Sequence, residues 1–168
     1  SDIRVAKTLP SKFYHDESIF KSLITAFNGW QYAVHRSELD ANSITPIDHI
    51  EAVTGEPIII VKGSEIKSIS NICTHRGMRL VTKPCTKSLM QCEYHGRTFQ
   101  LDGKMKHMPE FEQAIGFPSE SDNLHEFAMN TWKGLYFVSQ GSNKDLPWKN
   151  LNERFEFLDI ESFIHDPS

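Results

Sequence analysis

The sequence has few cysteines and no long apolar run. Three cysteines in 168 residues are too few, and odd in number, for a disulfide scaffold, so we expect a reducing, cytoplasmic location. The longest aliphatic run, residues 58–61, is far shorter than the roughly 18 residues of a membrane span. The first residues also lack the basic-then-apolar pattern of a signal peptide. We therefore expect no membrane partner.

A surplus of positive charge is also missing. The chain has 18 Lys and Arg against 22 Asp and Glu, a net charge of -4. A nucleic-acid ligand needs a basic face for its phosphates, so we expect no nucleic-acid partner. Hydrophobic residues make up 39% and charged residues 24%, which is ordinary for a globular protein long enough to bury one core.

Short β-strands separated by turn residues dominate the middle of the chain. Apolar runs and alternation predict strands at 30–35, 56–61, 65–72, on both sides of Asp102-Gly103 within 98–106, at 123–130 and at 134–139. Residues 110–122 show little alternation and are expected to form a loop with one helical turn. The pattern predicts an all-β fold class.

The two ends of the chain have a different character. Residues 1–15 are expected to be an extended arm, followed by a helix that Asp16 or Ser18 caps and that Asn28-Gly29 stops. After residue 147 the apolar residues are scattered among charges. We therefore divide the chain into an N-terminal arm and helix (1–30), a β domain (31–147) and a C-terminal connector (148–168).

Two short motifs carry the chemistry. The first is Cys73-x-His75 and the second, after 16 intervening residues, is Cys92-x-x-His95, each with a glycine close behind. Thiolates and imidazoles suit zinc, copper(I) and iron–sulfur clusters better than magnesium or calcium. Glycines allow tight loops, so two loops side by side could hold one metal centre.

Three interpretations of these motifs compete. A structural zinc site usually groups Cys with Cys and His with His along the chain, whereas here each motif has one of each. Unconnected residues would have to produce both spaced pairs by chance. A Rieske [2Fe–2S] centre needs two thiolates on one iron and two imidazoles on the other, which two such loops supply directly. The motifs therefore favour the Rieske centre.

The sequence around the motifs resembles the N-terminal Rieske domain of Rieske non-haem iron oxygenase α subunits, the aromatic-ring hydroxylases and their relatives. The resemblance covers roughly residues 9–147, through the segments "LPSKFYHDESIF", "WQYAVHRSEL", "GEPIIIVK", "SNICTHRG", "YHGRTFQLDGKM" and "TWKGLYFVS". It implies the Rieske fold of small stacked antiparallel sheets, here with an N-terminal helical extension.

The resemblance also implies roles for single residues. Cys73 and Cys92 would bind the inner iron of a [2Fe–2S] cluster, and His75 and His95 the outer, more exposed iron. The neighbourhood of Gly77, Tyr94 and Gly96 would supply hydrogen bonds around the cluster.

Two positions beside the motifs depart from common patterns. Many family members have Trp where this chain has Arg97. High-potential Rieske proteins carry an extra cysteine in each loop, and the two form a disulfide. Met78 stands in the first motif here, so a low-potential cluster is expected. Cys85 is expected to be a bystander. Arg76 and Arg79 are expected to offset the cluster charge, to pair with carboxylates or to lie exposed.

The function implied by the resemblance is electron transfer. The chain would receive electrons from a reductase or ferredoxin and deliver them to a mononuclear Fe(II) site in an oxygenase catalytic domain of the same or a neighbouring subunit. No compact two-histidine, one-carboxylate motif occurs in this sequence, so that iron is expected only in the missing domain. A free-standing Rieske ferredoxin and a zinc-stabilised interaction module are the alternatives.

Overall fold

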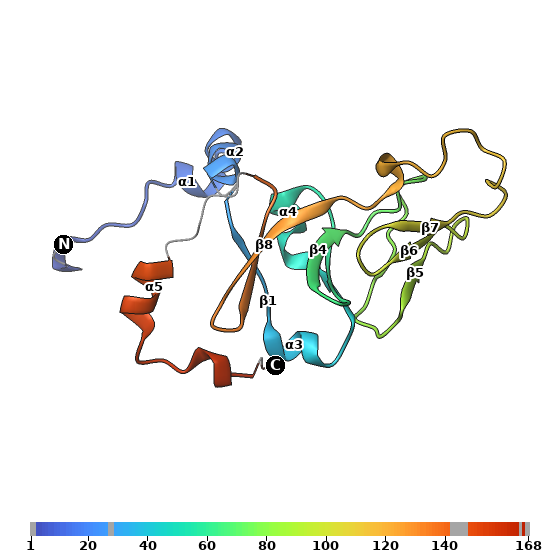
Figure 1. The fold of residues 1–168 in the computed structure, drawn as a ribbon. Helices are drawn as coiled ribbons and strands as arrows, with labels where there is room; N and C mark the ends of the chain where they lie inside the picture. The colour runs from blue at the N-terminus through green and yellow to red at the C-terminus, as the bar shows by residue number, and fades with distance from the viewer. Residues whose placement is uncertain (1–2, 27–28, 142–147, 165, 167–168) are drawn as a thin grey trace.

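A computed structural model describes residues 3–26, 29–141, 148–164 and 166 (Figure 1). Two antiparallel sheets form its body, one of six strands in the order β1-β9-β8-β4-β3-β2 and one of three in the order β5-β6-β7. The strands are β1 (Gln31–His35), β2 (Ile44–Ile47), β3 (Ile58–Lys62), β4 (Ile66–Ser70), β5 (Leu89–Gln91), β6 (Thr98–Gln100), β7 (Met105–His107), β8 (Glu126–Trp132) and β9 (Leu135–Ser139). The all-β prediction is confirmed.

Strand β3 is apolar on both faces because both faces are buried. Successive side chains of a strand point to opposite sides, and β3 follows this rule: Ile58 and Ile60 pack in one core, Ile59 and Val61 in the other. Each is at most 1% exposed. Burying an aliphatic side chain contributes about 1.5–3 kcal/mol, so this strand anchors the domain from both sides.

Two strands were not predicted, and one was displaced. β2 contains Pro46, which argues against a strand, but β2 lies at the edge of its sheet, where proline is tolerated. β5 has only three residues, too few to show alternation. The predicted strand at 123–130 runs from 126 to 132 instead, because the turn to β9 lies at Lys133 and Gly134, both with positive φ.

The helices are short and lie mainly at the two ends of the chain. They are η1 (Ile3–Val5), α1 (Lys12–His15), α2 (Glu17–Ala26), α3 (Arg36–Asp40), η2 (Asp48–Ile50), α4 (Glu51–Thr54), η3 (Glu120–Asp122), α5 (Trp148–Phe155) and η4 (Ile160–Ser162). The arm is thus not fully extended, since η1 and α1 interrupt it. Asp16 caps α2 by accepting a hydrogen bond from the amide of Ser18 (2.9 Å), whereas the predicted stop at Asn28 lies outside the described residues.

The C-terminal segment contains a helix that the scattered apolar residues did not predict. Trp132 Nε1 donates to Asn152 Oδ1 of α5 (2.7 Å), and Lys133 Nζ donates to the Leu158 carbonyl (3.1 Å). These bonds tie the segment to the β8–β9 turn. The predicted division into arm, β domain and connector stays a prediction.

The small sheet belongs to a long excursion from the large one. Residues 71–125 leave the end of β4 and return at the start of β8, and these two strands are paired through Ser68 with Phe127 and Ile69 with Glu126. The excursion carries β5, β6 and β7 and lies at the opposite end of the molecule from α1 and α5 (Figure 1).

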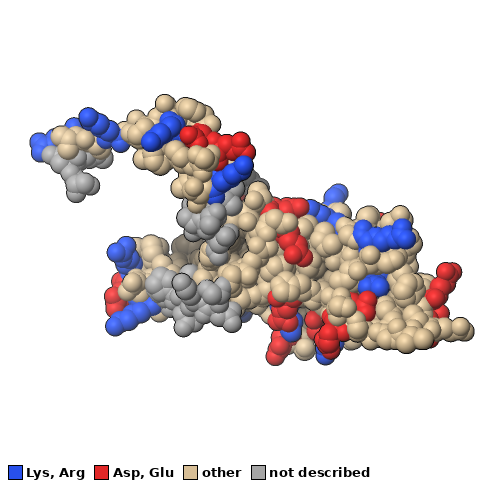
Figure 2. All heavy atoms as spheres, turned by 90° about the horizontal axis from the view of Figure 1, so that it is seen from above, with Lys and Arg blue, Asp and Glu red and all other residues tan. Residues whose placement is uncertain are grey.

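Surface charge is mixed in sign. On the face shown in Figure 2, basic and acidic side chains form small separate groups, and neither sign covers a continuous area. No helix among the described residues has the length and apolar composition of a membrane span.

Candidate metal centre

The two sequence motifs fold into loops with matching backbone hydrogen bonds. We call residues 73–78 the first loop and residues 92–97 the second loop. In each, the cysteine amide donates to the carbonyl five residues later, and the glycine amide donates back to the cysteine carbonyl. The N···O distances are 2.8 Å (Cys73–Met78) and 3.0 Å (Gly77–Cys73) in the first loop, and 2.8 Å (Cys92–Arg97) and 3.0 Å (Gly96–Cys92) in the second.

Glycine is required at the turn of each loop. Gly77 has φ of +70° and Gly96 has φ of +76°, a region that side-chain-bearing residues rarely adopt. A Cβ added at Gly96 would also lie 3.1 Å from Cγ of Pro109, whereas one at Gly77 would meet nothing within 4 Å. The amides of both glycines serve the loop backbone.

The loops bring like side chains together across the site. The Cys92 thiol lies close enough to Cys73 to raise the pKa of the Cys73 thiol. The rings of His75 and His95 meet edge to face, with centroids 4.7 Å apart. All four predicted ligand residues therefore lie at one place, with each loop giving one thiol and one imidazole.

The two pairs differ in depth. Cys73 and Cys92 are 2% and 3% exposed and belong to the apolar core that includes Ile59 and Phe99. His75 and His95 are half-buried, nearer the surface. The sulfur side of the centre is thus built into the core, while the imidazole side faces outward.

The electrostatics of the site favour metal binding at His75. Burial lowers the pKa of this ring, and the neighbouring His95, Arg97 and Arg76 lower it further, which keeps the ring neutral and able to ligate at neutral pH. Burial raises the pKa of the Cys73 thiol, and the neighbouring Cys92 adds to the rise. Metal binding at this sulfur must therefore displace a proton.

One buried atom at the site has no protein partner. Nδ1 of His95 is buried without a hydrogen bond among the described residues. An unsatisfied buried polar atom costs about 1–3 kcal/mol, and a metal ion bound at this nitrogen would remove that cost. Two thiols and two imidazoles, with one orphaned ring nitrogen, fit the donor set of a [2Fe–2S] cluster of the Rieske type.

Aromatic rings surround the imidazole side. Tyr94 is 57% exposed, and its ring lies against that of His95 with centroids 3.7 Å apart. The Phe111 ring lies edge-on to that of His75, with centroids 6.3 Å apart, and packs against the Phe117 ring, with centroids 5.0 Å apart. Tyr94 therefore touches the site through its ring and shields one side of His95 from water.

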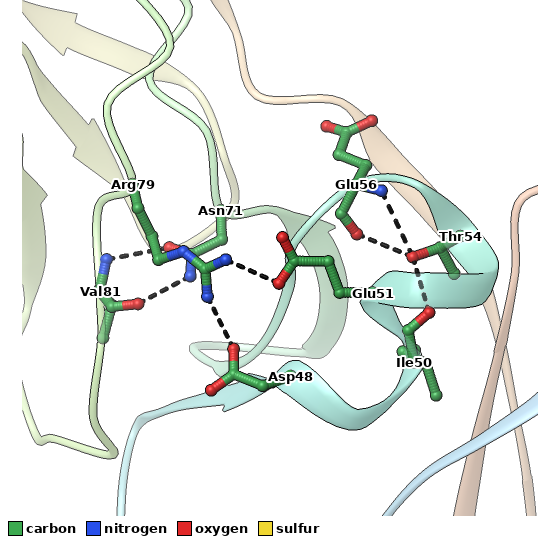
Figure 3. Close-up of polar contacts among 8 residues, drawn as sticks. All are labelled: Asp48, Ile50, Glu51, Thr54, Glu56, Asn71, Arg79 and Val81. Carbon is green, nitrogen blue, oxygen red and sulfur yellow. Dashed lines mark hydrogen bonds and ion pairs between the residues drawn. The ribbon is translucent and has the colours of Figure 1, made fainter.

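The ends of the first loop are fastened by a buried asparagine. Asn71 is fully buried; its Nδ2 donates to the Val81 carbonyl (2.7 Å) and its Oδ1 accepts from the Val81 amide (2.9 Å) (Figure 3). The Leu80 amide donates to the Asn71 carbonyl (3.0 Å). We call this closure, residues 71, 72 and 79–81, the neck of the first loop.

Arg79 connects the neck to the helical segment that joins β2 and β3 of the large sheet. Its guanidinium donates to Asp48 Oδ1 (2.8 Å) in η2 and binds Glu51 Oε2 (2.6 Å) in α4 (Figure 3). Of the roles expected for Arg79, pairing with carboxylates is the one observed. Asn71 could not be predicted as part of the site, because a single asparagine beside a motif has many possible partners.

The second loop also has a buried anchor. Arg97 is 3% exposed and lies between Thr74 of the first loop and Asp122 of η3. Sequence reasoning singled out Arg97 only as a departure from the common Trp and did not find Thr74 or Asp122. Cys85 lies outside the site, in a β-bridge with Ile44, and carries no disulfide.

Two loops that set thiols inward and imidazoles outward, on small antiparallel sheets, define an iron–sulfur protein of the Rieske class. Residues 29–128 match the model of the Rieske [2Fe-2S] domain. The chain belongs to this family, and its cofactor is the [2Fe–2S] cluster. The match favours the cluster over the zinc site.

Relatives of known activity are oxygenase subunits. The chain is 30% identical to the carnitine monooxygenase oxygenase subunit of Acinetobacter pittii (strain PHEA-2), over 92% of this chain and 42% of the relative. It is 28% identical to the biphenyl 2,3-dioxygenase subunit alpha of Rhodococcus jostii (strain RHA1), over 78% and 29%. The chain thus spans less than half the length of these relatives.

A solved structure shares the fold. A quaternary ammonium Rieske monooxygenase in complex with its substrate L-carnitine superposes with a TM-score of 0.77 and 27% identity, over 94% of this chain and 47% of that one. The predicted Rieske fold is therefore confirmed.

Proposed function

We propose that this chain is the electron-delivering part of a Rieske oxygenase subunit. The observation that carries the proposal is the pairing across two matched loops, thiols in the core and imidazoles toward the surface. The similarity to oxygenase subunits supports the oxygenase context over a free-standing ferredoxin. A [2Fe–2S] cluster supplies reversible one-electron chemistry when bound.

We assign the ligands by depth. Cys73 and Cys92 hold the inner iron and His75 and His95 the outer iron, because the thiols lie in the core and the rings lie nearer the surface. The half-buried rings form the shortest route between the site and a docked partner. Met78, 41% exposed, stands where a bridging cysteine would brace a high-potential cluster, which supports a low potential.

The partners follow from this role. A reductase or ferredoxin supplies the electrons, and a catalytic domain with mononuclear Fe(II), in the same or a neighbouring subunit, receives them. One solved relative is described as showing inter-subunit electron transfer, which supports the second arrangement. The cytoplasmic location stays a prediction from the sparse cysteines.

Anaerobic reconstitution with iron and sulfide tests the site. We expect about two irons and two acid-labile sulfides per chain, red-brown colour, and reversible bleaching with about one electron per chain from dithionite. C73S and H75A should abolish the colour. C85S and H107A are the matched controls and should keep it, because Cys85 and His107 lie outside the site.

Two results would overturn the proposal. One is a colourless protein with stoichiometric zinc and no sulfide, the signature of the interaction module. The other is loss of the cluster in C85S to the same extent as in C73S, which would place the ligands elsewhere.

A further inference from the structure

A buried arginine joins the two loops that form the metal centre. Nη1 of Arg97, in the second loop, donates to Thr74 Oγ1 in the first loop (2.7 Å) and to Asp122 Oδ1 (3.2 Å). The side chains of Arg97 and Asp122 are 4% and 18% exposed. The pair is thus largely shielded from solvent, and its charges are screened less than those of a surface pair.

A third segment holds the acidic partner in place. The Asp122 carboxylate accepts hydrogen bonds from the amide (2.8 Å) and the hydroxyl (2.9 Å) of Ser119. Thr74 Oγ1 donates in turn to the Asp122 carbonyl (2.7 Å). Arg97, Thr74 and Asp122 therefore form a closed ring of hydrogen bonds across three chain segments.

Both members of the pair are charged at neutral pH. Burial opposes ionisation of Asp122, but the Ser119 hydrogen bonds and the charge of Arg97 hold the pKa of this carboxyl below its ordinary value. The Arg97 guanidinium lies over the Phe117 ring, 5.4 Å from its centroid, and arginine stays protonated in proteins. The site therefore carries the positive charge of a buried arginine and the negative charge of a half-buried aspartate.

Arg97 lies beside residues of both motifs. Its hydrogen-bond acceptor Thr74 is flanked in the sequence by Cys73 and His75, and Arg97 itself follows His95 by two residues. A positive charge at this place stabilises negative charge added to the centre.

We propose that Arg97 and Asp122 are a buried charge pair that sets the reduction potential of the metal centre in opposite directions. Reduction adds one electron, so the cation raises the potential and the anion lowers it. This inference rests on the proposed function, because it requires the cluster to be bound between the two loops.

The sign of the change in reduction potential distinguishes an effect of charge from an effect of structural disruption. R97Q and D122N break the same ion pair, yet R97Q should lower the potential and D122N should raise it. We expect each to change the reduction equilibrium by about tenfold, which is about 59 mV for a one-electron couple. R97K keeps the charge and should lie between wild type and R97Q.

Matched controls separate the buried charge from other changes. T74V removes a hydrogen bond without a charge, and R76Q removes an exposed cation of the first loop that solvent screens. Each should shift the equilibrium by less than about threefold. Potentials are measured on the reconstituted chain by redox titration followed by visible circular dichroism, with iron and sulfide assayed in every variant.

The outcomes are distinct for the two proposals. A wild-type chain that holds no cluster refutes the proposed function. A wild-type chain with a reversible cluster, but shifts of the same sign in R97Q and D122N, or a shift in R97Q no larger than in R76Q, refutes this inference alone. If R97Q does not hold the cluster, the D122N variant provides the test. A reduction potential of D122N equal to or below that of wild type overturns the inference.

Discussion

Replacing Asn71 with alanine should destabilise the neck of the first loop. The substitution removes both side-chain hydrogen bonds from Asn71 to the backbone of Val81. The N–H and C=O groups of Val81 then stay buried without these partners. Each such loss costs about 1–3 kcal/mol, and the vacated volume adds to it. Because Asn71 is fully buried, water cannot replace the amide without entering the core.

The expected loss is about 3 kcal/mol in the free energy of unfolding. For a domain of this size, about 1 kcal/mol corresponds to about 2–4 °C, so the Tm should fall by about 6–12 °C. The cluster should also be released faster to an iron chelator, because the neck holds the loop that carries Cys73 and His75.

Thermal unfolding of the reconstituted protein, followed by far-UV circular dichroism and by visible absorption, measures both effects. N130A is the control. Asn130 is half-buried in β8, and within the described part of the chain its side chain accepts a hydrogen bond only from the next amide, that of Thr131. Its loss should therefore cost less than about 1 kcal/mol. N71D keeps the acceptor for Val81 but places a carboxylate against its carbonyl, and should cost at least as much as N71A. A stability of N71A within about 1 kcal/mol of wild type would refute this reasoning.

Three further predictions concern the loops. G96A should lower the free energy of unfolding by about 1 kcal/mol more than G77A in urea titrations, since both have positive φ but only Gly96 faces Pro109 closely; equal losses would contradict this. R79M should cost about 1 kcal/mol by losing both ion pairs, and the difference from wild type should shrink in 1 M salt; a difference independent of salt would count against the ion pairs. Iodoacetamide should label Cys85 of the native protein before Cys73 or Cys92, because those two are buried; mass spectrometry of the labelled peptides would reveal the opposite order.

Local patterns made the body of the fold predictable. The run at 56–61 indicated a buried strand, and Asp102-Gly103 indicated the β6–β7 hairpin that the structure contains. The spacing of the two motifs predicted that four residues share one site, because few protein sites use two such Cys and His pairs.

Features that depend on contacts distant in sequence could not be predicted. The strand with Pro46 exists only because its edge position tolerates proline. The Arg97–Asp122 pair joins positions 25 apart, and the neck depends on one asparagine finding the backbone ten residues away. Composition and periodicity contain no information about such pairings, since each residue alone is compatible with a solvated surface.

The excursion of residues 71–125 has its two ends on neighbouring paired strands, β4 and β8. Adjacent strands lie about 5 Å apart, so the whole metal-bearing unit starts and finishes at nearly one point, as an inserted domain does. Such a unit could in principle be transplanted between two antiparallel strands of a different protein. Its apolar underside packs on Ile44, Ile59 and Ile69 of the large sheet, so a recipient sheet must offer an equivalent aliphatic surface, and that requirement defines where a redox centre of this kind could be engineered.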